Sequence, residues 1–260
     1  MVKIAVANEK GGVAKTTTSV SLGASLAETG KKVLLVDLDA QANLTLALGF
    51  DPVKTRLSSA NLLMQAINLH EIIQETEYTN LYLIPSNKQM GLSEQFLPIH
   101  QGYEYFLRNA LASQNGRFDY ILMDCPPYLG SVTTNAFAAA DLLLIPTQSE
   151  YFSIYALRNM MERVRQIREK TNPQLTYRLL LTLFDKRNKI HRLLREQLKQ
   201  NFKNGMFETI INMDTKLRES AVAGTPIIYH APRSRAAIQY RSLAQEIIKY
   251  VEETKAVQPA

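Results

Sequence analysis

The chain has 260 residues, of which 46% are hydrophobic, and this length allows one domain or at most two around a sizeable core. Its only cysteine, Cys125, excludes an intrachain disulfide and a cysteine-ligated iron–sulfur or zinc centre. The net charge of +6 is unevenly distributed, because residues 1–150 carry 10 Lys+Arg against 14 Asp+Glu and residues 151–260 carry 20 against 10. A basic C-terminal part is typical of a protein that binds a nucleic acid or an anionic membrane.

Apolar runs of strand length alternate with segments that are long enough for helices. This alternation predicts a parallel sheet covered by helices on both faces, and the unbroken hydrophobicity of residues 33–36 fits a strand that is buried on both sides. No repeat or low-complexity segment divides the chain, so we expect one α/β domain over residues 1–260 with a doubly wound, mostly parallel sheet. The predicted strands are residues 3–7, 33–36, 81–84, 120–123, 142–145 and 177–183.

A glycine-containing loop follows the first predicted strand in residues 8–17, which read Asn-Glu-Lys-Gly-Gly-Val-Ala-Lys-Thr-Thr. Gly11 and Gly12 allow backbone N–H groups to approach phosphate oxygens, and a helix predicted over residues 16–28 presents an electropositive N-terminus. Lys15 can reach β and γ phosphates, and Thr16 can ligate Mg²⁺. The sequence therefore predicts a nucleotide-binding phosphate loop.

Two features set this loop apart from the ordinary phosphate-loop pattern. Glu9 and Ala14 occupy the two glycine positions of that pattern, so a plain motif search misses it. Lys10 is a second cation, and we expect it to project away from the phosphates bound by its own chain. The alternative, a strand-to-helix turn with solvated lysines, does not explain why strand, glycine pair, Lys-Thr-Thr and helix occur in this order.

Three carboxylates follow the ends of predicted strands. Asp37 and Asp39 come after the second strand, and Asp124 comes after the run at residues 120–123. Parallel strands end at one edge of a sheet, so these side chains are expected beside the phosphate loop, where carboxylates hold Mg²⁺. A single aspartate at such a place is more often a helix cap or turn residue, but three in register with a phosphate loop favour a metal–nucleotide site.

These residues resemble the ParA side of the ParA/MinD family of deviant Walker A P-loop ATPases. The resemblance covers essentially the whole chain and is most specific in the first half. It implies an ATPase that uses ATP and Mg²⁺ and forms a homodimer with ATP, in which Lys10 corresponds to the signature lysine that reaches the partner's phosphates. The matching segments are residues 10–17, 36–41, 122–127, 139–150 and 224–227, followed by Ser234, Tyr240, Leu243 and Ala244.

The resemblance also implies roles for single residues. Asp39 is expected to orient the attacking water and Asp37 to support the metal shell, although the two roles can be exchanged without contradicting the sequence. Ala14, Ala40 and Ala42 depart from the commoner family pattern, which has Gly, Pro and Gly there. The expected catalytic residues are Lys10, Lys15, Asp37 and Asp39; the expected ATP ligands are Lys10, Gly11, Gly12, Val13, Ala14, Lys15, Thr16 and Thr17; the expected metal ligands are Thr16, Asp124 and Asp37.

The adenine end of the site is expected between two loops. By family position these are the segment of residues 182–185, which ends a predicted strand, and the loop of residues 231–233. Phe184 and Pro232 would supply apolar walls, with Asp185 beside them. The alternative for Phe184 is an ordinary core side chain.

The C-terminal half contains basic residues at helical spacing. Arg192, Arg195 and Lys199 lie at i, i+3 and i+7, on one face of a predicted helix, and Lys216 and Arg218 begin a second such stretch. A stripe of this kind suits phosphate contacts without base reading, although a solvated helix face is the alternative. The predicted DNA-binding residues are Arg187, Lys189, Arg192, Arg195, Lys199, Lys216 and Arg218.

Together with the basic stripe, the resemblance implies an ATPase that binds nonspecific DNA on the nucleoid as an ATP dimer. It would position a plasmid, a chromosome origin or a protein compartment, and a ParB-like or adaptor protein would release it by stimulating hydrolysis. We expect a cytoplasmic, nucleoid-associated protein, because the apolar runs are far shorter than about 18 residues and no basic leader precedes the first strand. The alternative is a MinD-like membrane-surface ATPase that regulates the division site, but Glu252 and Glu253 make the C-terminal tail a poor anchor.

Overall fold

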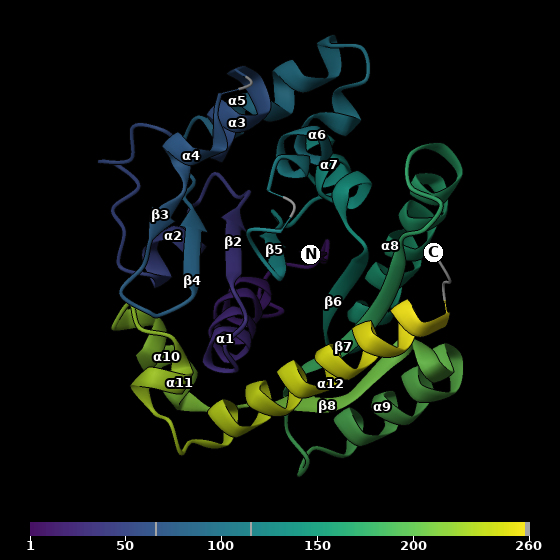
Figure 1. The fold of residues 1–260 in the computed structure, drawn as a ribbon. Helices are drawn as coiled ribbons and strands as arrows, with labels where there is room; N and C mark the ends of the chain where they lie inside the picture. The colour runs from purple at the N-terminus through teal and green to yellow at the C-terminus, as the bar shows by residue number, and fades with distance from the viewer. Residues whose placement is uncertain (66, 115, 258–260) are drawn as a thin grey trace.

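The computed structural model describes residues 1–65, 67–114 and 116–257, and the strands in this part of the chain form one sheet (Figure 1). The order is β3-β4-β2-β5-β1-β6-β7-β8, and all neighbouring strands are parallel except β3 and β4. The mostly parallel α/β sheet expected from the sequence is confirmed. The strands are β1 (Val2–Val6), β2 (Val33–Asp37), β3 (Gln74–Glu75), β4 (Leu81–Ile84), β5 (Tyr120–Asp124), β6 (Leu142–Gln148), β7 (Thr176–Phe184) and β8 (Met206–Asn212).

All six predicted strands are present, with ends that differ from the prediction by at most three residues. Two strands were not predicted. The first, β3, has two residues and lies at the edge of the sheet. The second, β8, closes the other edge, and its burial pattern is mixed because it lacks a strand on its outer side.

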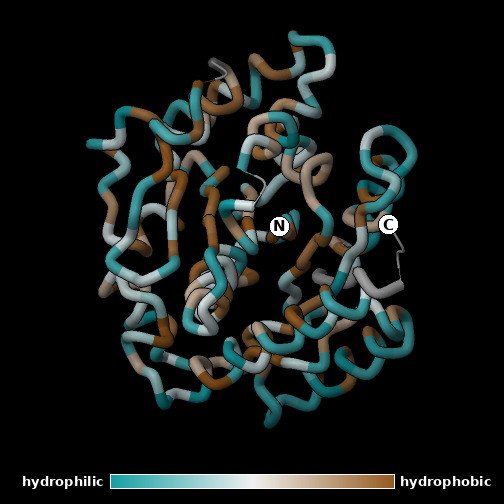
Figure 2. Tube along the Cα trace, in the orientation of Figure 1, coloured by the Kyte–Doolittle hydropathy of each residue, from teal (hydrophilic) through white to brown (hydrophobic). Residues whose placement is uncertain are grey.

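Helices cover both faces of the sheet, as predicted. Along each strand successive side chains point to opposite faces, so Ile4 and Val6 pack into one apolar cluster and Ala5 packs into the other. In Figure 2 the strands at the centre are the hydrophobic, brown part of the trace, and hydrophilic teal segments lie on the outside. The strands are therefore buried from both sides.

One face is covered by the two helices that lie beside each other along the sheet, the phosphate-loop helix and the C-terminal helix, with three shorter helices. The remaining helices cover the opposite face. On the first face lie α1 (Lys15–Glu28), α2 (Asn43–Ala47), α10 (Thr215–Val222), α11 (Ile227–His230) and α12 (Arg235–Val257). On the second lie α3 (Ser59–Gln65), α4 (Leu69–Ile72), α5 (Met90–Phe96), α6 (Phe106–Ala112), α7 (Ser131–Ala139), α8 (Tyr151–Lys170) and α9 (Lys189–Phe202). The 3₁₀ turns η1 (Leu97–Ile99) and η2 (Tyr103–Tyr105) also pack on this face, and η3 (Lys203–Gly205) follows α9.

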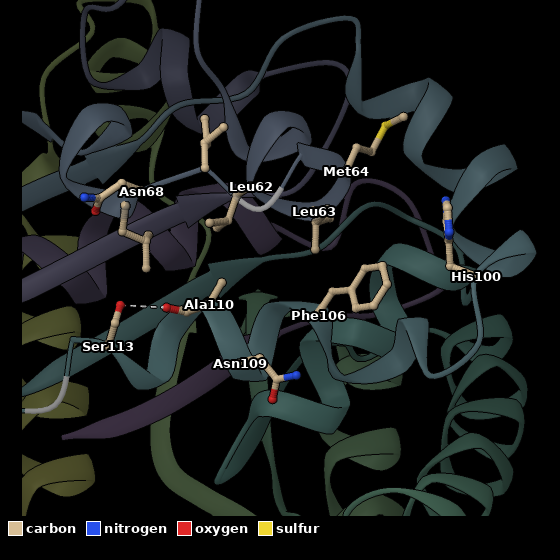
Figure 3. A pocket seen from close by; sticks show the side chains of 11 residues that line it. Leu62, Leu63, Met64, Asn68, His100, Phe106, Asn109, Ala110 and Ser113 are labelled. Carbon is tan, nitrogen blue, oxygen red and sulfur yellow. Dashed lines mark hydrogen bonds between the residues drawn. The ribbon is translucent and has the colours of Figure 1, made fainter.

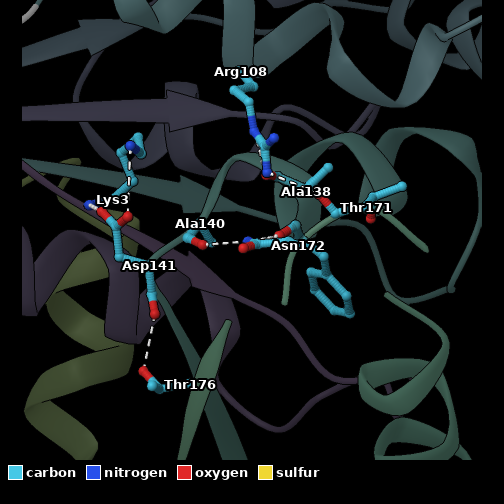
Figure 4. A network of polar contacts seen from close by, with 9 residues as sticks. Lys3, Arg108, Ala138, Ala140, Asp141, Thr171, Asn172 and Thr176 are labelled. Carbon is cyan, nitrogen blue, oxygen red and sulfur yellow. Dashed lines mark hydrogen bonds and ion pairs between the residues drawn. The ribbon is translucent and has the colours of Figure 1, made fainter. Parts of the chain in front are cut away.

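The carboxyl end of α7 is fixed by side chains from other elements. The last carbonyls of a helix have no partner inside it. Arg108 of α6 donates through Nε to the carbonyl of Ala138 at 2.8 Å, and Asn172 donates through Nδ2 to the carbonyls of Phe137 and Ala140 at 2.9 and 2.7 Å (Figure 4). These bonds tie α7 to the end of the sheet opposite the phosphate loop.

The C-terminal helix α12 packs along the sheet. Ile247 is fully buried and Val251 is 9% exposed, so its apolar side is occupied by the core. Within the described residues no helix has both the length and the apolar character required to cross a bilayer.

Candidate functional site

The phosphate loop lies where three neighbouring strands end. β1 lies next to β5, and β5 lies next to β2, so the segments that follow these strands meet at one edge of the sheet. Asp124 at the end of β5 is in register with Val6 of β1 and with Asp37 of β2. The structure brings together the phosphate loop and the carboxylates, which were expected to meet because parallel strands end at one edge of a sheet.

The backbone of the loop is open and electropositive. A Cβ on Gly11 or Gly12 would find no atom within 4 Å, so the space on that side of both glycines is open. Helix α1 begins at Lys15, and its N-cap residue Ala14 provides no side-chain hydrogen bond. The first N–H groups of α1 are thus without a capping side chain, which is the arrangement that binds a phosphate at a helix N-terminus.

Ala14 has an unusual backbone conformation for its residue type. Its φ of 66° and ψ of 36° place it in the left-handed region, and Gly12 also has a positive φ, of 74°. Ala42 repeats this conformation at the start of α2, with φ 53° and ψ 35°. Both alanines stand where the commoner family pattern has glycine, so the chain retains the glycine-type backbone and bears the strain of a Cβ.

Lys15 lies inside the phosphate loop and is only 9% exposed. Its Nζ donates to the carbonyl of Lys10 at 3.2 Å, which folds the loop around the ammonium group. Burial lowers the pKa of Lys15, and the nearby charge of Asp124 acts in the opposite direction. A partly desolvated cation of this kind interacts strongly with an added phosphate.

The ammonium group of Lys10 lies against the end of β6. Its Nζ donates to Oε1 of Gln148 at 3.0 Å and forms an ion pair with the carboxylate of Glu150. Gln148 in turn donates through Nε2 to the carbonyl of Gly12 at 3.2 Å. The two lysines of the motif therefore have different surroundings within one subunit.

Asp124 is tied directly to the phosphate-loop helix. Thr16 donates through Oγ1 to Oδ2 of Asp124 at 2.7 Å, and Ser19 donates through Oγ to Oδ1 at 2.8 Å. Burial raises the pKa of Asp124 to about 6, although both hydroxyl groups oppose that shift. A hydroxyl and a buried carboxylate are the hard oxygen ligands that Mg²⁺ prefers, so Thr16 and Asp124 fit this metal.

Sequence reasoning missed Ser19. It lies three residues beyond Thr16 in α1, and side chains at this spacing share one helix face. Helical periodicity counted from Thr16 would have identified it as a second hydroxyl facing Asp124.

Asp37 is fully buried, and its hydrogen bonds go to the segment that follows β2. Its Oδ2 accepts from the backbone N and the Oγ1 of Thr45 at 2.9 and 2.7 Å, and its Oδ1 accepts from the backbone N of Asp39 at 3.1 Å. Burial, followed by the charge of Asp124, raises the pKa of Asp37 to about 7. Asp37 thereby anchors the loop that carries Asp39.

Asp39 differs from Asp37 in exposure and in partners. It is half-buried, and its Oδ1 accepts from the backbone N of Gln41 at 2.9 Å. Its charge acts on the pKa of Lys15 and of Asp124, so Asp39 lies near both residues. Of the two aspartates whose roles the sequence left exchangeable, Asp39 is the accessible one.

Of the predicted adenine residues, Pro232 borders one of the described cavities, and Phe184 lies in the core. Pro232 borders a cavity of about 520 Å³ together with Asp214 and Lys216. Phe184 is 5% exposed and packs on the ring of His191, as the core alternative expected, and it is not among the residues that border this cavity. Asp185, the third predicted adenine residue, accepts hydrogen bonds from the side chain of Arg187 in the same loop.

The structure has two further cavities of note, one beside the phosphate-loop helix and one away from the loop. Thr17 borders a cavity of about 410 Å³ between α1, α2 and α10. A cavity of about 630 Å³ between α3 and α6 is mainly apolar, with Leu63 and Phe106 in its lining (Figure 3). The larger cavity contains none of the predicted site residues.

The seven predicted DNA-binding residues divide into two groups. The loops after the parallel strands β7 and β8 leave the same edge of the sheet, and Met213 donates from its backbone N to the carbonyl of Phe184 at 3.1 Å, so the starts of α9 and α10 are close. By contrast, residues 195 and 199 lie about 9 and 15 Å further along α9 at 1.5 Å per residue. Near the edge lie Arg187, Lys189, Arg192, Lys216 and Arg218; further away lie Arg195 and Lys199.

Most of these seven side chains already have a partner. Arg187 binds the carboxylate of Asp185 and thereby lowers the pKa of that carboxyl group to about 2. Arg192 donates to backbone carbonyls of its own loop, and Arg195, Lys199 and Lys216 form ion pairs. In the part of the chain that the structure describes, Lys189 and Arg218 are exposed and have no ion-pair partner.

Known proteins are similar to this chain in sequence and in fold. A family model described as an AAA domain matches residues 1–177. The sporulation initiation inhibitor protein Soj of Bacillus subtilis is 39% identical over 94% of this chain and 97% of its own length. The chromosome partitioning protein ParA of Myxococcus xanthus is 35% identical over 95% of this chain and 87% of its own length.

Solved structures superpose over nearly the whole chain. One is a cobyrinic acid a,c-diamide synthase from Mycobacterium smegmatis with bound ADP and magnesium, at 32% identity and a TM-score of 0.86, covering 97% of this chain and 96% of that one. Another is the septum site-determining protein MinD of Pyrococcus horikoshii with Mg-ADP, at 25% identity and a TM-score of 0.79, covering 96% of this chain and 97% of that one. With the phosphate loop and strand order described above, these matches show that the chain belongs to the ParA-type family of P-loop ATPases, together with Soj, ParA and MinD.

Proposed function

We propose that this protein is a Mg²⁺-dependent ATPase that pairs with a second copy when ATP is bound and then binds DNA without sequence preference. Hydrolysis, stimulated by a ParB-like or adaptor protein, ends this state and releases the DNA. The observation that carries the proposal is the pair of lysines in one phosphate loop: Lys15 contacts the backbone of its own loop, whereas Lys10 contacts the end of β6.

Binding of the triphosphate rests on the loop and the start of α1. The N–H groups of Gly11 and Gly12 and the ammonium of Lys15 bind the phosphates. Thr16 and Asp124 hold Mg²⁺, and Ser19 fixes the orientation of Asp124. When bound, Mg²⁺ would neutralise charge that develops on the transferring phosphate.

The two aspartates after β2 have separate roles in this proposal. Asp39 is the half-exposed carboxylate and orients the attacking water. Asp37 holds the backbone of Asp39 and the start of α2 in place through its bonds to Thr45. The accessible carboxylate therefore handles the water, and the buried one supports its position.

Lys10 serves the site of the partner subunit. A cation that enters an active site from a second protein stabilises the transition state in trans, and arginines that do so raise hydrolysis rates by about 10³- to 10⁵-fold. A lysine in this role makes hydrolysis depend on pairing. The adenine would lie in the cavity bordered by Pro232, near the loop of Asp185, with Phe184 supporting that loop from the core.

DNA binding is proposed for the edge that carries the starts of α9 and α10. Lys189 and Arg218 are the exposed side chains without an ion-pair partner in the described residues, so they can contact phosphate without breaking an existing pair. Arg187, Arg192 and Lys216 add positive charge at this edge, and Arg195 and Lys199 add it further along α9. Contacts of this kind would place the protein on the nucleoid in the cytoplasm, where it would position a plasmid, a chromosome origin or a protein compartment.

A binding assay with three nucleotide states tests the proposal. We expect a fluorescent DNA duplex of arbitrary sequence to be bound with ATP and Mg²⁺, and much more weakly with ADP or without nucleotide. The affinity should fall steeply between 50 and 200 mM salt, because phosphate contacts release counterions. Equal DNA affinity in all three states would refute the coupling, and ATP-dependent co-sedimentation with anionic liposomes instead of DNA binding would favour the MinD-like alternative.

A further inference from the structure

The side chain of Lys10 is part of a continuous chain of contacts that joins the phosphate loop to the end of β6. Its ammonium contacts Oε1 of Gln148 at 3.0 Å and the carboxylate of Glu150, and Gln148 reaches back to the carbonyl of Gly12 at 3.2 Å. The side chain of Lys10 is only 24% exposed, whereas that of Glu150 is 50% exposed. The lysine proposed to serve the partner subunit is therefore held by its own subunit.

Glu150 has a second possible role that it does not fulfil in this conformation. It is the residue that precedes α8, in extended conformation with φ −129° and ψ 151°, and a carboxylate there is well placed to accept from the first N–H groups of the helix. Its side chain makes no such capping bond and binds Lys10 instead. If Lys10 left, the carboxylate would have the N-terminus of α8 as an alternative partner.

We propose that Gln148 and Glu150 form a holder that keeps Lys10 in its own subunit and so opposes ATP-dependent pairing. This inference rests on the proposed role of Lys10 in the partner's site. The ammonium group cannot contact Glu150 of its own chain and a phosphate in the opposite subunit at once. Each subunit must therefore release Lys10 from Gln148 and Glu150 before the dimer can form. Glu150 thus acts as a positioning residue that raises the dissociation constant of the dimer.

The size of the effect follows from the exposure of the contact. A partly exposed ion pair shifts an equilibrium by up to about fivefold. Because only the open form of each subunit is competent to pair, the apparent dissociation constant of the dimer is raised by this factor once for each subunit, which gives about 25-fold in all. The dependence on two subunits distinguishes the holder from a contact that merely stabilises the monomer fold.

The test compares the wild-type protein with Glu150→Gln in the presence of Mg²⁺ and a non-hydrolysable ATP analogue. Sedimentation equilibrium over a range of protein concentrations gives the dissociation constant of the dimer, and a fluorescent analogue at protein concentrations below that constant gives nucleotide affinity of the monomer. We expect Glu150→Gln to lower the dissociation constant by about 25-fold and to leave monomer affinity unchanged. Salt should narrow the difference, because it screens the wild-type ion pair.

Two further variants serve as controls. Glu150→Asp keeps the charge and should give a dissociation constant between those of the wild type and Glu150→Gln. Glu253→Gln removes the carboxylate of an exposed pair with Lys249 in α12, far along the chain from the loop, and should leave pairing unchanged. Circular dichroism and thermal unfolding would establish that each variant folds.

The outcomes separate this inference from the function on which it rests. If wild-type dimers form and Lys10→Ala abolishes them, but Glu150→Gln pairs no better than wild type or pairs more weakly, the holder is wrong and the trans role of Lys10 stands. If Lys10→Ala pairs as well as wild type, the trans role itself fails. Tighter pairing of Glu150→Gln, with Glu150→Asp intermediate, supports both.

Discussion

The carboxyl edge of this sheet has two parts, the phosphate-loop edge where β1, β2 and β5 end and the basic edge where β7 and β8 end, and these hold their polar side chains in different ways. Around the loop, Asp37 and Asp124 are at most 1% exposed, and each accepts several hydrogen bonds. At the starts of α9 and α10, Lys189 and Arg218 are exposed, and their neighbours Arg187 and Lys216 pair with surface carboxylates. A buried polar group left without its partner is costly, whereas surface ion pairs contribute little.

This contrast predicts how each edge responds to substitution. At the loop the protein fixes the geometry before the ligand arrives, so the loss of one group removes a function. At the basic edge many charges share one task, so single losses are small, additive and dependent on salt. The five substitutions below probe this difference, from the largest expected effect to the smallest.

Replacing Asp39 with Ala should give the largest effect. Loss of the group that orients water is expected to reduce ATP turnover by about 10²- to 10⁴-fold, while ATP-dependent dimers still form. Phosphate release and sedimentation measure the two properties separately. Asp51→Ala, which removes an exposed carboxylate beyond α2, is the matched control and should keep the wild-type rate. An unchanged rate in Asp39→Ala would mean that another group handles the water.

Replacing Lys15 with Gln should weaken ATP binding by at least about 100-fold, because charge-assisted hydrogen bonds to phosphate are lost inside a partly buried loop. Titration calorimetry with Mg-ATP measures the change. Lys31→Gln, at the far end of α1, is the control for removing one positive charge. Micromolar affinity retained by Lys15→Gln would remove the phosphate-loop interpretation.

Reversing the charge of Arg218 with Glu should weaken DNA binding by about tenfold and reduce its salt dependence by at least one counterion. ATP affinity should not change, because the side chain lies on the outer surface of α10. Fluorescence anisotropy at several salt concentrations measures both quantities. Lys199→Glu, a reversal further along α9 of a residue that already pairs with Glu208, should have a smaller effect. If the two reversals are equal, the basic edge is not the contact surface.

The same contrast explains how much could be predicted from the sequence. Strands buried on both sides are continuous apolar runs, so six of the eight strands in the described residues were predicted with small errors at their ends. The two-residue strand β3 has no periodicity to detect, and the edge strand β8 alternates irregularly between exposed and buried positions. The phosphate loop and the aspartates were found because the types of residue and their order along strands specify the chemistry.

The residues that the sequence did not reveal act through partners that are distant in the chain. Gln148 and Glu150 lie 138 and 140 positions from Lys10, so only the folded sheet brings them together. Ser19 lies 105 positions from Asp124, and only its helical spacing from Thr16 would have indicated the contact. Phe184 illustrates an ambiguity of another kind, because an apolar residue at the end of a strand can either line a ligand site or pack in the core. The choice between these depends on burial, which one sequence does not specify.

Replacing Ala42 with Gly tests the backbone strain beside the nucleotide site. A left-handed conformation costs an alanine about 1–2 kcal/mol, and glycine loses part of this advantage through greater freedom in the unfolded chain. We expect a net gain of about 0.5–1 kcal/mol in the free energy of unfolding, measured by urea denaturation. Ala27→Gly, within α1, should instead destabilise the protein by about 1 kcal/mol or more. Equal losses in both variants would show that residue 42 bears no strain.

The smallest effect is expected at the ion pair between α1 and α12, where Arg241 contacts both carboxylate oxygens of Glu28 at 2.6 and 2.8 Å. The hydrogen bond from Arg241 lowers the pKa of Glu28. A lowered pKa in the folded state stabilises the protein above the pKa of the unfolded chain, and this contribution disappears as the pH falls through the folded value. Because both side chains are about one-third exposed, Glu28→Gln should cost less than about 1 kcal/mol at pH 7. Urea denaturation at pH 7 and at pH 3 should show that difference shrinking at the lower pH, and a gap of equal size at both would assign the cost to packing of the two helices instead of charge.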